Sequence, residues 1–227
     1  MTDEPPEPTT VVLVRHGVTE YTTGRRFSGG LGGHNPALSE EGRAQIGLVA
    51  EWLSPLRDRA AAVVTSPVRR TRESAELLGE AWGVPVVEEP SFAEMEFGAW
   101  EGLTFDEVGE QNRDELLAWF ESVDARPGGT GESFRSVEER VLAGLDRLLT
   151  AYRGQTVVVV SHVTPIKTLV THALEAPTAS QFRLQLTPGS VTVLSFRDPD
   201  QPGPPATVRL LNALPPPQPA FLDHGGW

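Results

Sequence analysis

Histidine and arginine follow three short apolar runs of this sequence. Arg15-His16-Gly17 follows the run Val11–Val14, and Ser66-Pro67-Val68-Arg69-Arg70 follows the run Ala61–Thr65. Ser161-His162 follows the run Thr156–Val160. A neutral imidazole nitrogen can attack phosphorus and carry a phosphoryl group covalently. Arginine side chains beside it neutralise the charge that spreads over the phosphoryl oxygens. The pattern therefore indicates phosphoryl transfer, provided that the fold brings the three segments together.

The surrounding segments predict the elements that would position these residues. The β-branched runs are typical of buried parallel strands, and we expect a further edge strand at Val84–Val87 and a closing hairpin of Ser190–Phe196 and Thr207–Leu211. The expected helices begin after Ser39 and at Ser66-Pro67, each with serine as N-cap, and cover 114–121, 133–152 and 165–174. This alternation predicts an α/β fold with a mostly parallel central sheet and helices on both faces. Ligands bind beyond the carboxyl ends of such strands, so His16 and His162 should meet there.

Length and composition predict one domain. The chain has 227 residues and no cysteine, and no apolar stretch reaches the ~18 residues that a membrane helix needs. We expect a disordered leader or linker at 1–10, a domain at 11–212 with a cap at about 88–139, and a proline-rich tail at 213–227. The acidic, proline-rich start is unlike a signal peptide, so we expect a cytoplasmic protein without a membrane contact.

Acidic residues are concentrated in the expected cap. The net charge is -12, and residues 88–139 hold 15 acidic and 3 basic side chains. A nucleic-acid surface would need a basic stripe, so we expect no direct nucleic-acid binding. The histidines are far apart and no carboxylates stand at ligand spacing, so we expect no metal site.

Five groups of motifs together resemble the histidine phosphatase (phosphoglycerate mutase-like) superfamily. In family order they are Leu13–Glu20, Arg26–Gly29 with Pro36–Gly42, Thr65–Thr71, Glu94–Gly102, and Gly131–Ser133 with Val160–His162. The resemblance covers residues 11–212, nearly the whole chain. It implies a phosphoglycerate mutase-like fold with a short acidic cap, a phosphohistidine intermediate and no cofactor.

The resemblance also implies the catalytic residues. His16 resembles the phosphorylated nucleophile, and Glu94 resembles the acid that protonates the leaving alcohol. Arg15, Arg70 and His162 resemble the rest of the phosphate pocket. Position in the motif favours Glu94 over the other glutamates of the same acidic run.

The remaining candidate site residues match the family motifs less closely. The hydroxyl of Ser28 and the backbone amide of Gly29 resemble groups that hold the substrate phosphate. Thr22 stands where the family has a pocket asparagine, and Val163 replaces a glycine, although its backbone amide could still donate. Arg26 could hold phosphate, hold a substrate carboxylate or pair with the acidic cap.

The short cap favours one activity of the superfamily over another. Water can reach the phosphohistidine of an open site, so a phosphomonoesterase of the acid phosphatase type, acting on small phosphorylated metabolites, is favoured over a phosphoglycerate mutase. The loops around Arg26 and Thr164 resemble the α-ribazole phosphatase-like branch, and the acid phosphatase domain of actinobacterial bifunctional ribonuclease H/acid phosphatase proteins. This implies α-ribazole phosphate as a candidate substrate and a ribonuclease H domain as a candidate fusion or association partner. An alternative of another class is a non-catalytic domain that binds a phosphate ligand.

Overall fold

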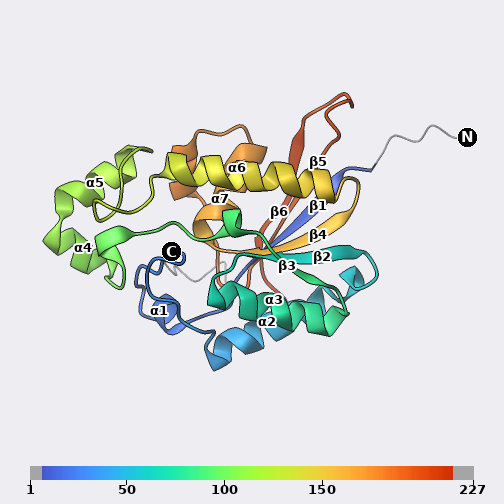
Figure 1. Ribbon diagram of the computed structural model, residues 1–227, viewed down its shortest axis with the longest axis horizontal. Helices are drawn as coiled ribbons and strands as arrows, with labels where there is room; N and C mark the ends of the chain where they lie inside the picture. The colour runs from blue at the N-terminus through green and yellow to red at the C-terminus, as the bar shows by residue number, and fades with distance from the viewer. Residues whose placement is uncertain (1–6, 217–227) are drawn as a thin grey trace, which may run out of the picture.

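A six-stranded mixed sheet forms the centre of the computed structural model, which describes residues 7–216 (Figure 1). The strands are β1 (Thr9–Arg15), β2 (Ala60–Thr65), β3 (Val86–Glu88), β4 (Thr156–Ser161), β5 (Val191–Phe196) and β6 (Ala206–Ala213). Their order across the sheet is β3-β2-β4-β1-β5-β6. The first four of these are parallel to one another, whereas β5 pairs antiparallel with both β1 and β6. The predicted α/β fold with a mostly parallel sheet, an edge strand β3 and a closing hairpin is confirmed.

Helices cover both faces of this sheet. They are α1 (Glu20–Thr23), α2 (Glu40–Trp52), α3 (Arg69–Trp82), α4 (Phe105–Gln111), α5 (Arg113–Glu121), α6 (Phe134–Ala151) and α7 (Val163–Ala173). In Figure 1, α6 and α7 lie above the sheet, α2 and α3 lie below it, and α4 and α5 form a cap at the left. Within residues 7–216, no helix combines the length and the apolar character that crossing a membrane requires.

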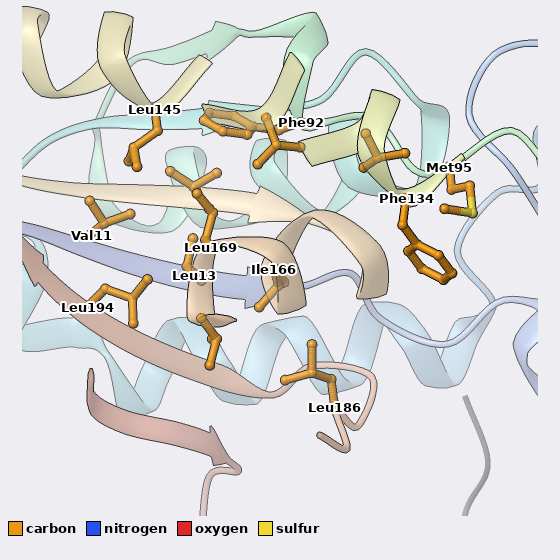
Figure 2. Packing of buried hydrophobic residues seen from close by; sticks show 14 of the residues in the cluster. Val11, Leu13, Phe92, Met95, Phe134, Leu145, Ile166, Leu169, Leu186 and Leu194 are labelled. Atoms are coloured by element: carbon orange, nitrogen blue, oxygen red, sulfur yellow. The ribbon is translucent and has the colours of Figure 1, made fainter. Parts of the chain in front are cut away.

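Alternate residues of β1 face opposite helical layers. Val11 and Leu13 belong to one buried cluster, with Phe92, Leu145, Ile166 and Leu169 among its members (Figure 2). Val12 and Val14 belong to a second cluster on the other face, which residues of α2 and α3 complete. Because both faces are buried, the strand needs apolar side chains at every position, which explains the continuous run in the sequence. This packed centre fixes the positions of the residues that follow the strand.

Two helix starts show where the sequence patterns succeeded and failed. Ser39 is the N-cap of α2, and its hydroxyl accepts the backbone N–H of Gly42 at 3.0 Å, as predicted. The prediction that Ser66 caps α3 is wrong, because that helix begins at Arg69 with Val68 as its N-cap. The Ser66 hydroxyl lies 2.8 Å from the side chains of both Thr71 and His162 and accepts the backbone N–H of Val68 at 3.3 Å.

The ends of the domain also differ slightly from the expected limits. β1 begins at Thr9, so the expected leader at 1–10 overlaps the sheet, and β6 ends at Ala213, one residue into the expected tail. The remainder of those two predictions, at 1–6 and 217–227, lies outside the described residues.

The acidic segment contains one helix more than the sequence indicated. α5 covers the expected helix at 114–121, but α4 was not expected. A capping box starts α4, in which Thr104 and Glu107 each bond to the other's backbone N–H. The Trp119 ring packs on Trp100 and Phe134, with centroids 5.7 and 5.1 Å away. The Trp119 ring also packs on Phe182, outside the acidic segment, with centroids 5.3 Å apart, so aromatic contacts attach the cap to the body of the domain.

Candidate active site

The carboxyl ends of β1 and β4 bring two histidines together, as expected. Arg15 pairs with Ser161 in the sheet register, so the next residues, His16 and His162, are neighbours with ring centroids 5.2 Å apart. Arg70, in the first turn of α3, reaches the same place, and its Nε–H donates to His16 Nε2 over 3.2 Å. Three segments that are distant in sequence thus meet at one edge of the sheet.

The two nitrogens of the His16 ring have different partners. Nδ1 lies 2.8 Å from the carbonyl oxygen of Gly17. A carbonyl can only accept, so Nδ1 carries the ring proton and Nε2 keeps its lone pair. Burial, followed by the charges of Arg70 and Arg15, lowers the pKa of His16 well below 6.5. His16 is therefore neutral at pH 7, with a nucleophilic nitrogen at Nε2.

Two buried arginines supply positive charge to this nitrogen. Burial lowers the pKa of Arg15 and of Arg70 to about 10, so both remain charged at neutral pH. The Arg70 guanidinium donates to the carbonyls of Ser28 and Gly29 at 3.1 and 3.0 Å and to the Ser28 hydroxyl at 3.3 Å. Arg15 donates to the Leu186 carbonyl, while its Nε has no hydrogen-bond partner among residues 7–216. A buried cation with an unused donor favours an anionic ligand.

His162 is fully buried and does not line the cavity in front of His16. Its Nε2 lies 2.8 Å from the hydroxyl of Ser66. Its Nδ1 has no hydrogen-bond partner in the described part of the chain. Burial, and then the charge of Arg70, lowers the pKa of His162 well below 6.5. Both histidines are thus neutral at pH 7.

Among the glutamates between residues 88 and 101, Glu94 is the one that lines the cavity. Its carboxylate accepts the backbone N–H groups of Met95 at 2.8 Å, Val163 at 3.1 Å and Thr164 at 3.2 Å. The last two belong to the first turn of α7, whose positive end favours a carboxylate. The Val163 amide, which we expected to hold phosphate, is therefore engaged by Glu94.

Two other glutamates of the acidic run hold the glycine-rich loop. Glu96 Oε1 accepts the N–H groups of Leu31 and Gly32 at 2.8 and 3.1 Å. Glu101 Oε2 accepts the N–H of Gly29 at 2.9 Å. The structure thus differs from the expectation that this amide faces phosphate, because a carboxylate already occupies it.

Thr22 and Arg26 line the cavity and also support the loop and the cap. Thr22 Oγ1 lies 3.1 Å from Thr19 Oγ1, within the capping box of α1. Arg26 Nη1 donates to the Glu107 carboxylate at 3.0 Å and to the Gly102 carbonyl at 2.7 Å. Of the three alternatives for Arg26, the structure contains the pair with the acidic cap.

Sequence reasoning missed residues that support the site. Ser66, predicted as a helix cap, bonds instead to the ring of His162. Arg140 donates to the carbonyls of Ala93 and Glu94 at 2.8 and 3.1 Å and to the Glu132 carboxylate at 2.8 Å, so it fixes the backbone that carries Glu94. Glu132 belongs to the motif Gly131–Ser133, so the sequence contains a signal for its role. Arg140 is one of many charged residues on an amphipathic helix, and no pattern distinguishes it.

A cavity of about 520 Å³ opens in front of His16 and Arg70. Aromatic side chains line it on the side of the cap, namely Phe27, Phe97, Phe105 and Trp119. Besides the residues already described, the polar lining includes Tyr21, Thr22, Arg25, Arg26 and Asp106. This volume is in the range of sites for small metabolites. No cluster of three or more metal-ligating side chains occurs within residues 7–216.

Comparison with known proteins agrees with this geometry. Residues 11–202 match the histidine phosphatase superfamily (branch 1). The chain is 42% identical over 189 residues to the bifunctional protein Rv2228c of Mycobacterium tuberculosis, which is 83% of this chain and 50% of that protein. The chain therefore spans about half the length of the first curated relatives that it matches.

Two further relatives are covered over most of their length. Phosphoserine phosphatase 1 of Hydrogenobacter thermophilus is 34% identical over 159 residues, 70% of this chain and 73% of that protein. The solved structure of the mycobacterial glucosyl-3-phosphoglycerate phosphatase Rv2419c is 31% identical, with a TM-score of 0.75 over 90% of this chain and 98% of that one. With its two strand-end histidines, its buried arginines and its match to the family over residues 11–202, the chain is an enzyme of the histidine phosphatase superfamily, branch 1.

Proposed function

We propose that this chain is a phosphomonoesterase that hydrolyses a small phosphorylated metabolite through a phosphohistidine on His16. The observation that carries the proposal is the tautomer of His16. Its Nδ1–H is held by the Gly17 carbonyl, which leaves the Nε2 lone pair beside the Arg70 guanidinium at the cavity. A nucleophile that is neutral at pH 7 and borders two cations suits attack on an anionic phosphate.

The first half-reaction forms a bond between His16 Nε2 and phosphorus and breaks the bond between phosphorus and the ester oxygen. Arg70 and Arg15 stabilise the charge on the phosphoryl oxygens. The leaving alkoxide takes a proton from Glu94, which lines the same cavity.

The second half-reaction returns the enzyme to its starting state. Water attacks phosphorus, the bond to Nε2 breaks, and Glu94 takes the proton that the water loses. Glu94 is then again the carboxylic acid. Its two oxygens can keep the three backbone N–H donors in both charge states, so the residue need not move between the two steps.

The cavity lining supports a leaving group with a planar apolar part. Aromatic residues form the cap side of the cavity, and the volume of about 520 Å³ leaves room beyond a phosphate. This supports α-ribazole phosphate, which carries an aromatic base, as a candidate substrate. Comparing kcat/KM for α-ribazole phosphate, phosphoserine, 3-phosphoglycerate and a sugar phosphate tests this choice; the proposal requires the first to exceed the other three.

A second domain is the proposed partner of this enzyme. The similar mycobacterial protein is named bifunctional, and this chain corresponds to half of it. We infer that a ribonuclease H domain accompanies the phosphatase domain in such proteins, while the phosphatase itself remains cytoplasmic and acts on metabolites.

Rapid quenching with ³²P-labelled substrate tests the proposed reaction. Wild-type protein should give an acid-labile, base-stable adduct, and His16→Asn should give none. His172, an exposed histidine on α7, provides the matched control, since His172→Asn should retain the adduct. An adduct in His16→Asn would place the nucleophile elsewhere.

The same assay separates the two alternative functions. Conversion of 3-phosphoglycerate to 2-phosphoglycerate faster than phosphate release would indicate a mutase. Phosphate-ligand binding with neither adduct nor turnover from pH 5 to 8 would indicate a non-catalytic binding domain.

A further inference from the structure

The His162 side chain has Ser66 and His16 as neighbours, and they follow the two strands that flank β4. Strand β4, which ends at Ser161, has β2 on one side and β1 on the other. Ser66 follows β2 and meets His162 Nε2 at 2.8 Å, whereas the His16 ring follows β1 at a centroid distance of 5.2 Å. Nδ1 of His162 has no hydrogen-bond partner among the described residues. The side chain has no solvent exposure.

The hydrogen bonds of Thr71 decide which way the Ser66 hydroxyl points. Thr71 Oγ1 lies 2.8 Å from the Val68 carbonyl and 3.1 Å from the Ser66 carbonyl. A carbonyl only accepts, so the single hydroxyl hydrogen of Thr71 is used there. Thr71 Oγ1 must then accept the hydrogen of Ser66 Oγ, 2.8 Å away.

This leaves Ser66 Oγ only its acceptor capacity for His162. A hydroxyl offers one donor and two acceptor positions. The donor is used by Thr71, one acceptor position takes the Val68 N–H at 3.3 Å, and the other faces His162 Nε2. His162 Nε2 must therefore carry a hydrogen, and in the neutral ring Nδ1 is bare.

We propose that Ser66 and Thr71 fix neutral His162 as its Nε2–H tautomer, which leaves Nδ1 without a hydrogen. Binding of a phosphoryl dianion is then coupled to the uptake of one proton by His162 Nδ1, which donates it to a phosphoryl oxygen. Ser66 and Thr71 are positioning residues in this scheme. The uptake step rests on the proposed phosphatase function, whereas the tautomer does not. No bond between heavy atoms changes: the proton comes from solvent and remains on Nδ1 while the anion is bound.

The charged groups around His162 explain why the proton arrives with the ligand. The charges that act on the ring belong to Arg70 on α3, Arg15 and His16 at the end of β1, and Arg140 on α6, and they lower the pKa of His162. Glu94 accepts an N–H at the start of α7, the helix that follows His162. The cations and the burial disfavour a charged ring in the free site. A dianion bound at His16, whose ring centroid lies 5.2 Å from that of His162, reverses this balance, and a proton on the unpartnered Nδ1 would let that nitrogen donate to a phosphoryl oxygen.

The tautomer can be measured without any ligand. In ¹⁵N-labelled wild-type protein at about pH 8, well above the pKa of an ordinary histidine, the two ring nitrogens of His162 should show a protonated-type shift at Nε2 and a bare, pyridine-type shift at Nδ1. His16 should show the opposite pattern, because its Nδ1 donates to Gly17. Assignment uses the spectrum of His162→Asn. A bare Nε2 in wild-type His162 would overturn the proposal.

Thr71 offers a matched pair of variants. Thr71→Val removes the acceptor and frees the Ser66 hydrogen, and no other acceptor of the described residues bonds to Ser66 Oγ, so that hydrogen should turn to His162 Nε2 and reverse the tautomer. Thr71→Ser keeps the hydroxyl and should keep the wild-type pattern. An unchanged His162 pattern in a folded Thr71→Val variant would contradict the role of the hydroxyl chain.

Proton uptake is measured by calorimetry with phenylphosphonate, which is not hydrolysed and is a dianion without a proton at about pH 8.5. Titration in two buffers of different ionisation enthalpy should show about one more proton taken up per ligand bound by wild-type protein and by Thr71→Ser than by Thr71→Val, a difference in which uptake by other groups of the site cancels. Binding by wild-type protein without uptake, or no binding, would overturn the coupling. A missing adduct on His16 with the expected tautomer would instead overturn the proposed phosphatase function alone.

Discussion

At the scale of single residues, the protonation of His16 determines when the site can react. Its Nε2 lone pair attacks only in the neutral ring, and burial with Arg70 and Arg15 lowers the pKa of that ring well below 6.5. A lowered pKa keeps the nucleophile neutral in acid, so kcat/KM should be maintained below pH 6.5 and fall only under the lowered pKa. Arg70→Met should raise that pKa and move the acid limb to higher pH. An NMR titration of the His16 ring separates this change from ionisation of the substrate.

Glu94 should matter in proportion to the leaving group's need for a proton. An alkoxide needs a proton in the transition state and p-nitrophenolate does not, and a positioned acid contributes about 10²–10⁴-fold. Glu94→Gln should therefore lower kcat for an alkyl phosphate by about that factor and for p-nitrophenyl phosphate by much less. Glu96→Gln is the control, because Glu96 holds loop amides and should leave the ratio of the two rates unchanged. Equal losses on both substrates in Glu94→Gln would assign the acid to another group.

Sequence reasoning located the side chains of the site but not all of its hydrogen bonds. His16 and His162 could be predicted because each follows a buried strand, and strand register then makes them neighbours. The hydrogen bonds of the Gly29 and Val163 amides could not be predicted. Their acceptors, Glu101 and Glu94, are 72 and 69 residues away in the sequence. Local pattern carries no information on which distant carboxylate reaches an amide.

At the scale of elements, helix α2 contains two glycines with opposite surroundings. A Cβ added at Gly42 would lie 2.1 Å from the Val18 carbonyl oxygen, whereas at Gly47 nothing lies within 4 Å. Gly47→Ala should stabilise the protein by up to about 1 kcal/mol, the difference in helix propensity. Gly42→Ala should destabilise it by about 1–3 kcal/mol through overpacking, and the displaced loop includes the residues next to His16. Urea unfolding of both variants measures the difference; equal effects would mean that the loop moves aside freely.

The elements themselves were predictable to different degrees. Strands buried on both faces are apparent in the sequence as continuous apolar runs, and helices with a strong apolar face, such as α6, are apparent as an apolar repeat of helical period. The start of α3 was misplaced because the helix begins at Arg69, and the Ser66 hydroxyl bonds to the side chains of Thr71 and of His162, the latter 96 positions away. α4 was missed because only Val108 of its seven residues is buried, so its short sequence lacks an apolar repeat.

At the scale of the whole molecule, one buried base should make stability depend on pH. Lys167 is the only lysine of the sequence and is 4% exposed on α7. Burial, with a further contribution from Arg15 that Glu94 opposes, lowers the pKa of Lys167 to about 7. The unfolded chain holds this proton up to about pH 10. From about pH 7 upward the folded protein therefore holds fewer protons than the unfolded one, so the free energy of unfolding should rise with pH, by at most about 1.4 kcal/mol per pH unit. As pH falls through 7, this contribution is lost.

Lys167→Met tests this dependence, because it replaces the amine by an apolar chain of similar length. Wild-type protein should become more stable between about pH 7 and pH 9, and Lys167→Met should show a flatter profile and exceed wild type most at the lower end, where the folded protein must bury a charge. Urea unfolding in phosphate-free buffer measures both, since phosphate would stabilise the folded state by binding at His16 and Arg70. The arginines near the site, with pKa values of about 10, contribute little in this range. Parallel profiles for the two proteins would mean that Lys167 keeps its proton in the folded state.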